Sequence, residues 1–318
     1  SDGGEGMLEA FAEVEGGRLI KVSAHDALKR PMETAYAFCE DTKTAYIETA
    51  RTAGLTLLRK EERNPLLTTT FGVGETVAAA LARGAQRIVV GLGGSATNDG
   101  GTGMAEALGF RFWDAKGKAV SGYGKNLERI VRMEDTDVND QLRQATFTAA
   151  CDVKAPFCGP QGAVEVFARQ KGADETAVKC LESGMHHFGA VLSDYCGYAV
   201  TSCPGSGAAG GLGGAMMALM EAEMTSGIAL LLHTPQFQTT LEGATLILTG
   251  EGCLDAQTEM GKAAWGILQE GRKRNVPVLA IAGKVVHEEA ALQMGFSAIE
   301  SATPESQTLT FAMQPDIA

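Results

Sequence analysis

Short apolar runs of strand length alternate with stretches of helical spacing along most of the chain. Met7, Leu8, Phe11 and Val14 fall on one helical face, and residues 87–90 form an apolar run between polar segments. Repeats of three to four residues predict helices, and compact β-branched or aromatic runs predict strands. The pattern predicts helices at residues 5–14, 75–83, 174–193 and 208–224, and strands at residues 19–23, 44–49, 87–90, 110–113 and 147–151.

The last 75 residues give the most regular pattern. We expect strands at residues 245–249, 277–282 and 296–301, with helices at residues 262–273 and 287–294 between them. Strands that alternate with helices over short connections predict a parallel sheet covered by helices. Because the middle of the chain alternates less regularly, we expect two α/β domains, with the long helix near 208–224 as the junction.

Three glycine-rich segments, which we expect to be loops, each follow an apolar run that resembles a strand. They are residues 91–103 (GLGGSATNDGGTG) after residues 87–90, residues 204–214 (PGSGAAGGLGG) after residues 198–201, and residues 249–255 (TGEGCLD) after residues 246–248. Glycines at the carboxyl end of a strand let backbone N–H groups approach an anion, and a helix N-terminus adds a favourable dipole. Together the three segments predict an enzyme that handles phosphate or another small anion.

Composition narrows the class of protein. The formal net charge of −12 argues against a nucleic-acid partner, which would require basic patches. The apolar run at residues 227–232 has the length of a strand and is too short to cross a bilayer. The seven cysteines lack any Cys-x-x-Cys spacing, which is typical of reduced, buried thiols in a cytoplasmic enzyme.

Acidic side chains follow the predicted strands. Asp99, Asp152, Glu251 and Asp255 lie at or just beyond strand ends, where open α/β sheets bind ligands. A kinase requires oxygen ligands for Mg²⁺ and often a carboxylate that accepts the proton of the substrate hydroxyl. Lys262 opens a predicted helix, where the dipole disfavours a cation unless an anion binds, so a phosphate contact is one interpretation and an ordinary surface lysine is the other.

A different class of enzyme is suggested by the spacing of Gly205, Gly207 and Gly210, which matches a dinucleotide-binding fingerprint. The next predicted strand, residues 228–232, is followed by His233 and lacks the acidic residue that would bind a ribose. An NAD-dependent hydroxy-acid dehydrogenase is therefore an alternative, and a phosphate loop or a structural helix start are the other interpretations.

At the level of motifs, the chain resembles the bacterial glycerate kinases that phosphorylate D-glycerate at the 2-position with ATP. The resemblance rests on motifs that run in family order over nearly the whole chain. They are residues 2–6 (DGGEG), 69–75 (TTFGVGE), 91–104, 150–153 (ACDV), 159–163 (GPQGA), 170–173 (QKGA), 204–211 and 249–258 (TGEGCLDAQT), with Gly261 and Lys262 at the end.

The resemblance implies a flavodoxin-like parallel domain, residues 1–15 and 215–318, and an inserted mixed α/β domain with a restriction-enzyme-like core, residues 16–214. The active site is then expected in the cleft between them, with ATP and Mg²⁺ as cofactors and glycerate as substrate; a homodimer stays open. Asp255 and Asp152 are expected as catalytic residues and metal ligands, and Asp2, Gly3 and Gly4 as substrate-binding residues. The expected cofactor-binding residues are Gly93, Gly94, Ser95, Thr97, Asn98, Asp99, Gly205, Gly207, Glu251 and Lys262.

This sequence departs from the family pattern at several places. Arg169 stands where the family usually has Pro, and Cys253 stands where Arg is common. Members of the family usually begin with a strand and a loop bearing Lys and Ser ahead of the Asp-Gly-Gly segment, and Ser1 begins this sequence without them. An inactive fragment or a non-catalytic anion-binding protein is therefore a further alternative to the kinase.

Overall fold

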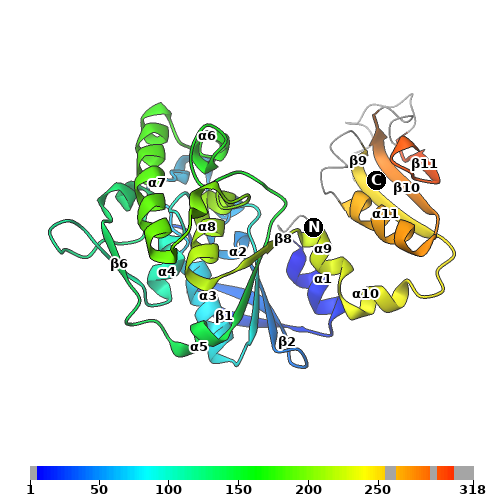
Figure 1. Ribbon diagram of the computed structural model, residues 1–318, viewed down its shortest axis with the longest axis horizontal. Helices are drawn as coiled ribbons and strands as arrows, with labels where there is room; N and C mark the ends of the chain where they lie inside the picture. The colour runs from blue at the N-terminus through cyan, green and yellow to red at the C-terminus, as the bar shows by residue number, and fades with distance from the viewer. Residues whose placement is uncertain (1–5, 255–262, 287–291, 304–318) are drawn as a thin grey trace. The chain divides into compact units, whose positions relative to one another are not determined.

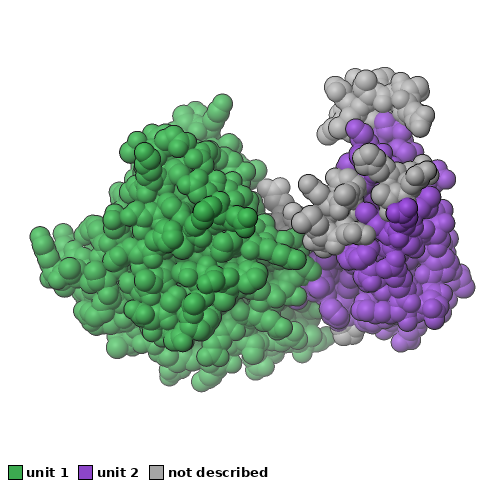
Figure 2. All heavy atoms as spheres, turned by 45° about the horizontal axis from the view of Figure 1, so that its top comes forward, with its two compact units in different colours: residues 1, 3–227 green, residues 2, 228–318 purple. Residues whose placement is uncertain are grey.

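The computed structural model describes residues 6–254, 263–286 and 292–303 (Figure 1). The chain forms two compact units, which divide between Gly227 and Ile228 and are coloured separately in Figure 2. Unit 1 precedes this point and unit 2 follows it. The division lies later than the expected boundary at residue 215, and the expected pairing of residues 1–15 with the C-terminal domain stays a prediction.

A six-stranded mixed sheet forms the centre of unit 1, with strand order β1-β2-β3-β4-β7-β8. Its strands are β1 (Arg18–His25), β2 (Pro31–Cys39), β3 (Thr44–Glu48), β4 (Arg87–Gly91), β7 (Thr146–Ala150) and β8 (Glu223–Thr225). The β1–β2 and β2–β3 pairs are antiparallel, whereas β3, β4, β7 and β8 run parallel to one another. Four neighbouring strands therefore end at one edge of the sheet, which we call the carboxyl edge.

Helices and a small second sheet complete unit 1. The helices are α1 (Met7–Val14), α2 (Ala50–Ala53), α3 (Phe71–Ala82), α4 (Thr102–Ala107), α5 (Asp140–Gln144), α6 (Ala163–Phe167), α7 (Glu175–Cys196) and α8 (Ala208–Met220). Short 3₁₀ turns are η1 (Leu55–Leu57), η2 (Lys60–Glu62), η3 (Gly124–Arg129), η4 (Arg169–Lys171) and η5 (Val200–Ser202). The antiparallel strands β5 (Arg111–Trp113) and β6 (Arg132–Glu134) form the second sheet.

Both faces of the mixed sheet are covered, as β3 shows. All five residues of β3 are buried, and its side chains alternate between the two faces. Tyr46 stacks on Phe11 of α1 with ring centroids 4.3 Å apart, while Ala45 belongs to the same core as Val73 and Val77 of α3. A central strand with no exposed face is typical of parallel sheets with helices on both sides.

Unit 2 carries a three-stranded parallel sheet in the order β11-β10-β9. Its elements are α9 (Gly227–Leu232), α10 (Pro235–Thr240), β9 (Ile247–Leu254), α11 (Ala263–Arg274), β10 (Val278–Val285) and β11 (Ala298–Ser301), with Gly227 the last residue of unit 1. Leu268 of α11 packs in one core with Leu254 and Ala280 of the strands. The expected parallel C-terminal sheet is confirmed, and so is the α/β class; the flavodoxin-like and restriction-enzyme-like assignments stay predictions.

Four sequence expectations are wrong. Residues 198–201 contain no strand, because the 3₁₀ turn η5 begins at Val200, and residues 228–232 belong to α9. The helix expected over 208–224 ends at Met220, since Glu221 turns into the left-handed region (φ 52°) and β8 follows. Residues 249–254 are not a loop but the second half of β9, hydrogen-bonded in register to β10. In addition, β2 was not expected.

The cysteines of the chain are all free thiols, as expected. Their burial differs from the expectation: Cys39 is buried, Cys180 is exposed and the others are half-buried. The described part of the chain contains no helix that is long and apolar enough to cross a membrane.

An aromatic cluster joins the small sheet, α7 and the loop after β7. Phe188 of α7 is fully buried, and its ring lies 5.9 Å from that of Phe112 and 6.4 Å from that of Phe157. Because deletion of a buried phenyl ring leaves a cavity, Phe188→Ala should lower the free energy of unfolding by about 3–5 kcal/mol, measured by urea denaturation. Val166→Ala, at a side chain that is 51% exposed, is the control and should change it little. Equal losses in both variants would contradict this core assignment.

Candidate active site

Loops that follow the four parallel strands gather at the carboxyl edge. Thr49 follows β3, residues 92–101 follow β4, Asp152 lies just beyond β7 and Ser226 follows β8. In open α/β sheets, ligands bind outside the carboxyl ends of the strands. The carboxyl edge is therefore the place in unit 1 where we look for a ligand-binding site.

The loop at residues 92–101, here called the glycine loop, is fixed by backbone hydrogen bonds on both sides. Leu92 N–H donates to the Ala150 carbonyl (3.0 Å), and Ala96 N–H donates to the Ala53 carbonyl (2.7 Å). Gly94 has φ 71°, and a Cβ there would lie 3.2 Å from the Ala50 Cβ. The loop is thus held in a shape that its glycines make possible.

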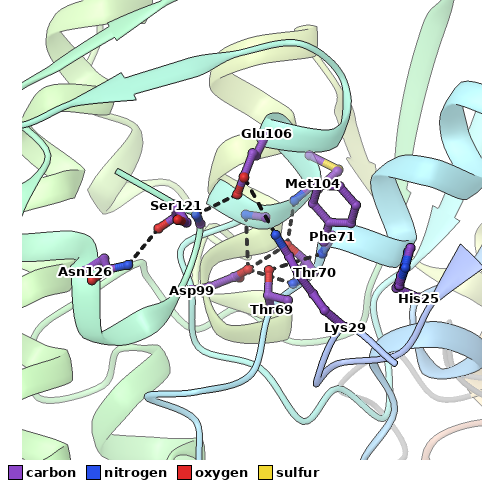
Figure 3. A network of polar contacts seen from close by, with 12 residues as sticks. His25, Lys29, Thr69, Thr70, Phe71, Asp99, Met104, Glu106, Ser121 and Asn126 are labelled. Carbon is purple, nitrogen blue, oxygen red and sulfur yellow. Dashed lines mark hydrogen bonds and ion pairs between the residues drawn. The ribbon is translucent and has the colours of Figure 1, made fainter. Parts of the chain in front are cut away.

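Asp99 organises the end of the glycine loop. Its buried carboxylate accepts hydrogen bonds from Thr70 N–H (2.7 Å), Thr70 Oγ1 (2.9 Å), Gly101 N–H (3.1 Å) and Gly103 N–H (3.2 Å), a network drawn in Figure 3. Thr70 Oγ1 in turn accepts from Met104 N–H (2.9 Å). Burial raises the pKa of the Asp99 carboxyl, and these hydrogen bonds oppose the rise. Asp99 has a structural role here, and its expected part in cofactor binding stays a prediction.

A second glycine-rich segment, residues 204–214, packs directly on the glycine loop. Gly100 N–H donates to the Gly210 carbonyl (2.9 Å), and a Cβ on Gly210 would lie 2.1 Å from the Thr97 carbonyl oxygen. Ala209, Gly210 and Gly211 all have positive φ, which breaks the first turn of α8. The two segments therefore approach at backbone contact distance, which only glycine permits at position 210.

The second segment also contacts the loop that carries Asp152. Gly207 N–H donates to the Ala155 carbonyl (3.0 Å), and a Cβ on Gly207 would lie 2.1 Å from the Pro156 oxygen. Gly205 has φ 84° and lies against Val153. The structure thus brings together the residues expected at 93–99, Asp152, and Gly205 with Gly207.

Buried polar side chains without a partner among the described residues cluster in these loops. They include Thr97 Oγ1, both amide atoms of Asn98 and Ser206 Oγ, together with the Oγ1 atoms of Thr49 and Thr52 near the end of β3. Each unpaired buried group costs about 1–3 kcal/mol, so such groups mark places where a ligand or water completes the hydrogen bonding. Sequence reasoning found Thr97 and Asn98 but missed Ser206, Thr49 and Thr52, which no spacing rule separates from ordinary helix and turn residues.

A cavity of about 880 Å³ lies beside the carboxyl end of β3. Glu48 at its wall is 3% exposed and accepts hydrogen bonds from Leu8 N–H (3.1 Å) and Arg51 Nε (3.0 Å), and Arg51 also pairs with Glu9. The charged residues of the lining are Glu9, Lys21, Glu33, Glu48 and Arg51. Carboxylates outnumber cations there, so the glycine-rich loops suit an anion better than this cavity does.

The other expected site residues belong to unit 2 or lie outside the described residues. Glu251 is half-buried in β9 of unit 2. Asp2, Gly3, Gly4, Asp255 and Lys262 lie outside the described residues. Within the described ranges, no group of three or more His, Cys, Asp or Glu side chains is placed to hold a metal ion.

The elements around Gly205, Gly207 and Gly210 are not those of a dinucleotide-binding site. Gly205, Gly207 and Gly210 follow the 3₁₀ turn η5 where a βαβ unit requires a strand, and the segment after α8 and β8 is the helix α9. A dehydrogenase site of the Rossmann type is therefore contradicted at this segment.

Comparison with known proteins identifies the family. The model of the glycerate kinase family matches residues 1–316. This chain belongs to the glycerate kinase family. It is 41% identical to the glycerate kinase of Bacillus cereus (strain ATCC 10987 / NRS 248) over 97% of this chain and 81% of that protein. It is 36% identical to the glycerate 2-kinase of Escherichia coli (strain K12) over 99% of this chain and 83% of that one.

A solved structure supports the same assignment. A crystal structure assigned as glycerate kinase 2 from Salmonella typhimurium LT2 matches with a TM-score of 0.85 and 35% identity, over 94% of this chain and 79% of that one. These comparisons confirm the expected family and the α/β fold class. They also confirm the expected enzyme class, a kinase that phosphorylates glycerate.

The Asp99 network gives a stability prediction. Asp99→Asn places an NH₂ group among N–H donors and removes the charge, so we expect a loss of about 3 kcal/mol in the free energy of unfolding. Asp137→Asn is the matched control, because the side chain of Asp137 is 58% exposed. Chemical denaturation measures both; a loss for Asp99→Asn no larger than for the control would show that the carboxylate does not organise the loop.

Proposed function

We propose that this chain transfers the γ-phosphoryl group of ATP to the 2-hydroxyl of D-glycerate and forms 2-phosphoglycerate and ADP. The family match over residues 1–316 carries the proposal, because it covers the whole of the described chain. The contact between the two glycine-rich segments at the carboxyl edge supports a site there.

The loops have the properties that phosphoryl transfer requires. Catalysis of this reaction depends on positioning and on groups that stabilise charge on the transferred phosphoryl oxygens. Backbone N–H groups of residues 93–95 supply hydrogen-bond donors at the surface of the loop. The unpartnered side chains of Thr97, Asn98 and Ser206 lie buried behind them. We place the phosphates of ATP at this edge.

The residues present fit Mg²⁺ in the manner usual for kinases. Mg²⁺ keeps several waters and is bound by one or two carboxylates together with substrate phosphates, so a cluster of three protein ligands is not required. Asp152 lies half-buried beside the second glycine-rich segment and would be such a carboxylate, with Asp255 as the second candidate. When bound, the ion would neutralise phosphate charge.

The acceptor half of the reaction needs a base. The 2-hydroxyl oxygen of glycerate forms the new P–O bond, the bond to the ADP oxygen breaks, and the hydroxyl proton passes to Asp152 or Asp255. The expected substrate-binding residues Asp2, Gly3 and Gly4 precede Gly6, which lines the cavity beside β3. Composition further predicts a cytoplasmic enzyme without nucleic-acid or membrane partners.

Product identification tests the function. The chain is incubated with ATP, Mg²⁺ and D-glycerate, ADP release is followed by a coupled assay, and the product is identified by ³¹P NMR. We expect ADP release that depends on D-glycerate and a signal from 2-phosphoglycerate. Formation of 3-phosphoglycerate would contradict the proposed position, and a lack of turnover would support the non-catalytic alternative.

The glycine loop gives a matched pair of variants. Gly94→Val forces a β-branched residue to φ 71° against Ala50, whereas Gly117→Val imposes the same strain (φ 72°) where nothing lies within 4 Å. Strain of 1–2 kcal/mol at the loop should weaken binding of Mg·ADP by about tenfold, measured by calorimetry, with unchanged far-UV circular dichroism. Equal binding by the two variants would exclude the glycine loop from the nucleotide site.

A further inference from the structure

Lys171, at the end of η4, reaches the glycine loop from its buried side. The residue is 3% exposed, and its Nζ donates to Ser95 Oγ (2.9 Å) and to the Thr97 carbonyl (2.7 Å). Gly172, with φ 95°, lets the chain turn against the Arg63 backbone directly after it. A segment about 75 residues away in sequence therefore holds the shape of the loop.

The surroundings of Lys171 are unusual for a buried cation. Both acceptors are neutral, whereas buried ammonium groups normally pair with a carboxylate. Asp99 is the charged group that acts on it from the glycine loop. Arg63 packs against the adjacent Gly172, and its guanidinium donates to the Leu55 carbonyl (3.5 Å). Arg169 on the same turn pairs with Glu165 and Glu175. Burial lowers the pKa of Lys171 to about 7, and Asp99 opposes this fall.

Both protonation states of Lys171 satisfy the loop. A neutral amine has two N–H donors, enough for Ser95 and Thr97, and the ammonium has a third. The loop can therefore keep the same shape in either state. The electrostatic potential at the loop differs between the two states, because only the ammonium is charged. An anion bound at the loop stabilises the ammonium, since an opposite charge nearby favours the charged form.

We propose that Lys171 is a positioning residue that fixes the phosphate-binding loop through Ser95 and Thr97 and takes up a proton when a nucleotide phosphate binds there. The proposal rests on the proposed ATP site and goes beyond it, because it assigns the loop a buried counter-charge and couples nucleotide affinity to pH near neutrality. Above pH 7 the free enzyme loses the charge, so binding must recruit a proton.

Calorimetry tests the coupling directly. Mg·ADP binding is measured at pH 8 in two buffers with different ionisation enthalpies, which gives the number of protons taken up. We expect uptake of about 0.5 to 1 proton by the unmodified chain and none by Lys171→Met. Lys179→Met, at an exposed lysine of α7, is the matched control and should behave like the unmodified chain.

The pH profile of the KM for ATP provides a readout that a merely structural role would not change. The KM for ATP should rise by up to about tenfold per pH unit above pH 7 in the unmodified chain. For Lys171→Met it should be high and independent of pH. Lys171→Arg keeps the charge at all these pH values and should give a flat, low KM. If thermal unfolding shows that Lys171→Met is not folded, the test uses the KM profile of Lys171→Arg and the proton uptake of the unmodified chain instead.

The outcomes separate the two proposals. Binding of Mg·ADP without proton uptake, or uptake that persists in Lys171→Met, would overturn the role of Lys171 and leave the kinase proposal intact. A lack of Mg·ADP binding by the unmodified chain would overturn both.

Discussion

The buried carboxylate of Asp99 is the interaction on which the carboxyl edge of unit 1 depends. It joins Thr70, at the start of α3, to Gly101 and Gly103, at the start of α4, and so fixes where the glycine loop ends. Without a carboxylate, four donors in the core would lose their acceptor, at a cost comparable to a large part of the stability of a domain. Asp99 therefore builds the site and need not touch a ligand.

The close approach of two glycine-rich segments is the second constraint. Gly210 and Gly207 leave no room for a Cβ against residue 97 or Pro156, so the loops after β4 and β7 are brought into backbone contact with the start of α8. The unpaired side chains of Thr97, Asn98 and Ser206 lie in these same loops. A site of fixed backbone donors and shielded polar groups suits catalysis by electrostatic stabilisation, which requires that the groups be oriented in advance.

Local patterns predicted the elements whose signal is local. The helix of α7, the strands β4 and β7 and the parallel sheet of unit 2 follow from periodicity. Residues 228–232 could not be assigned from their apolar run, because a short buried helix and a strand look alike, and Gly250 and Gly252 lie in a strand despite their composition. The role of Lys171 could not be predicted from its motif, because its contact with Ser95 exists only after distant segments fold together.

The central claim is that phosphate binds at the glycine loop of the carboxyl edge. A crystal structure of the chain with a non-hydrolysable ATP analogue, Mg²⁺ and D-glycerate tests it most directly. The account predicts phosphate density within hydrogen-bond distance of the backbone N–H groups of residues 93–95, with Lys171 still bound to Ser95 and Thr97. Phosphates seated in the cavity beside β3, or against the amino ends of the strands, would contradict it.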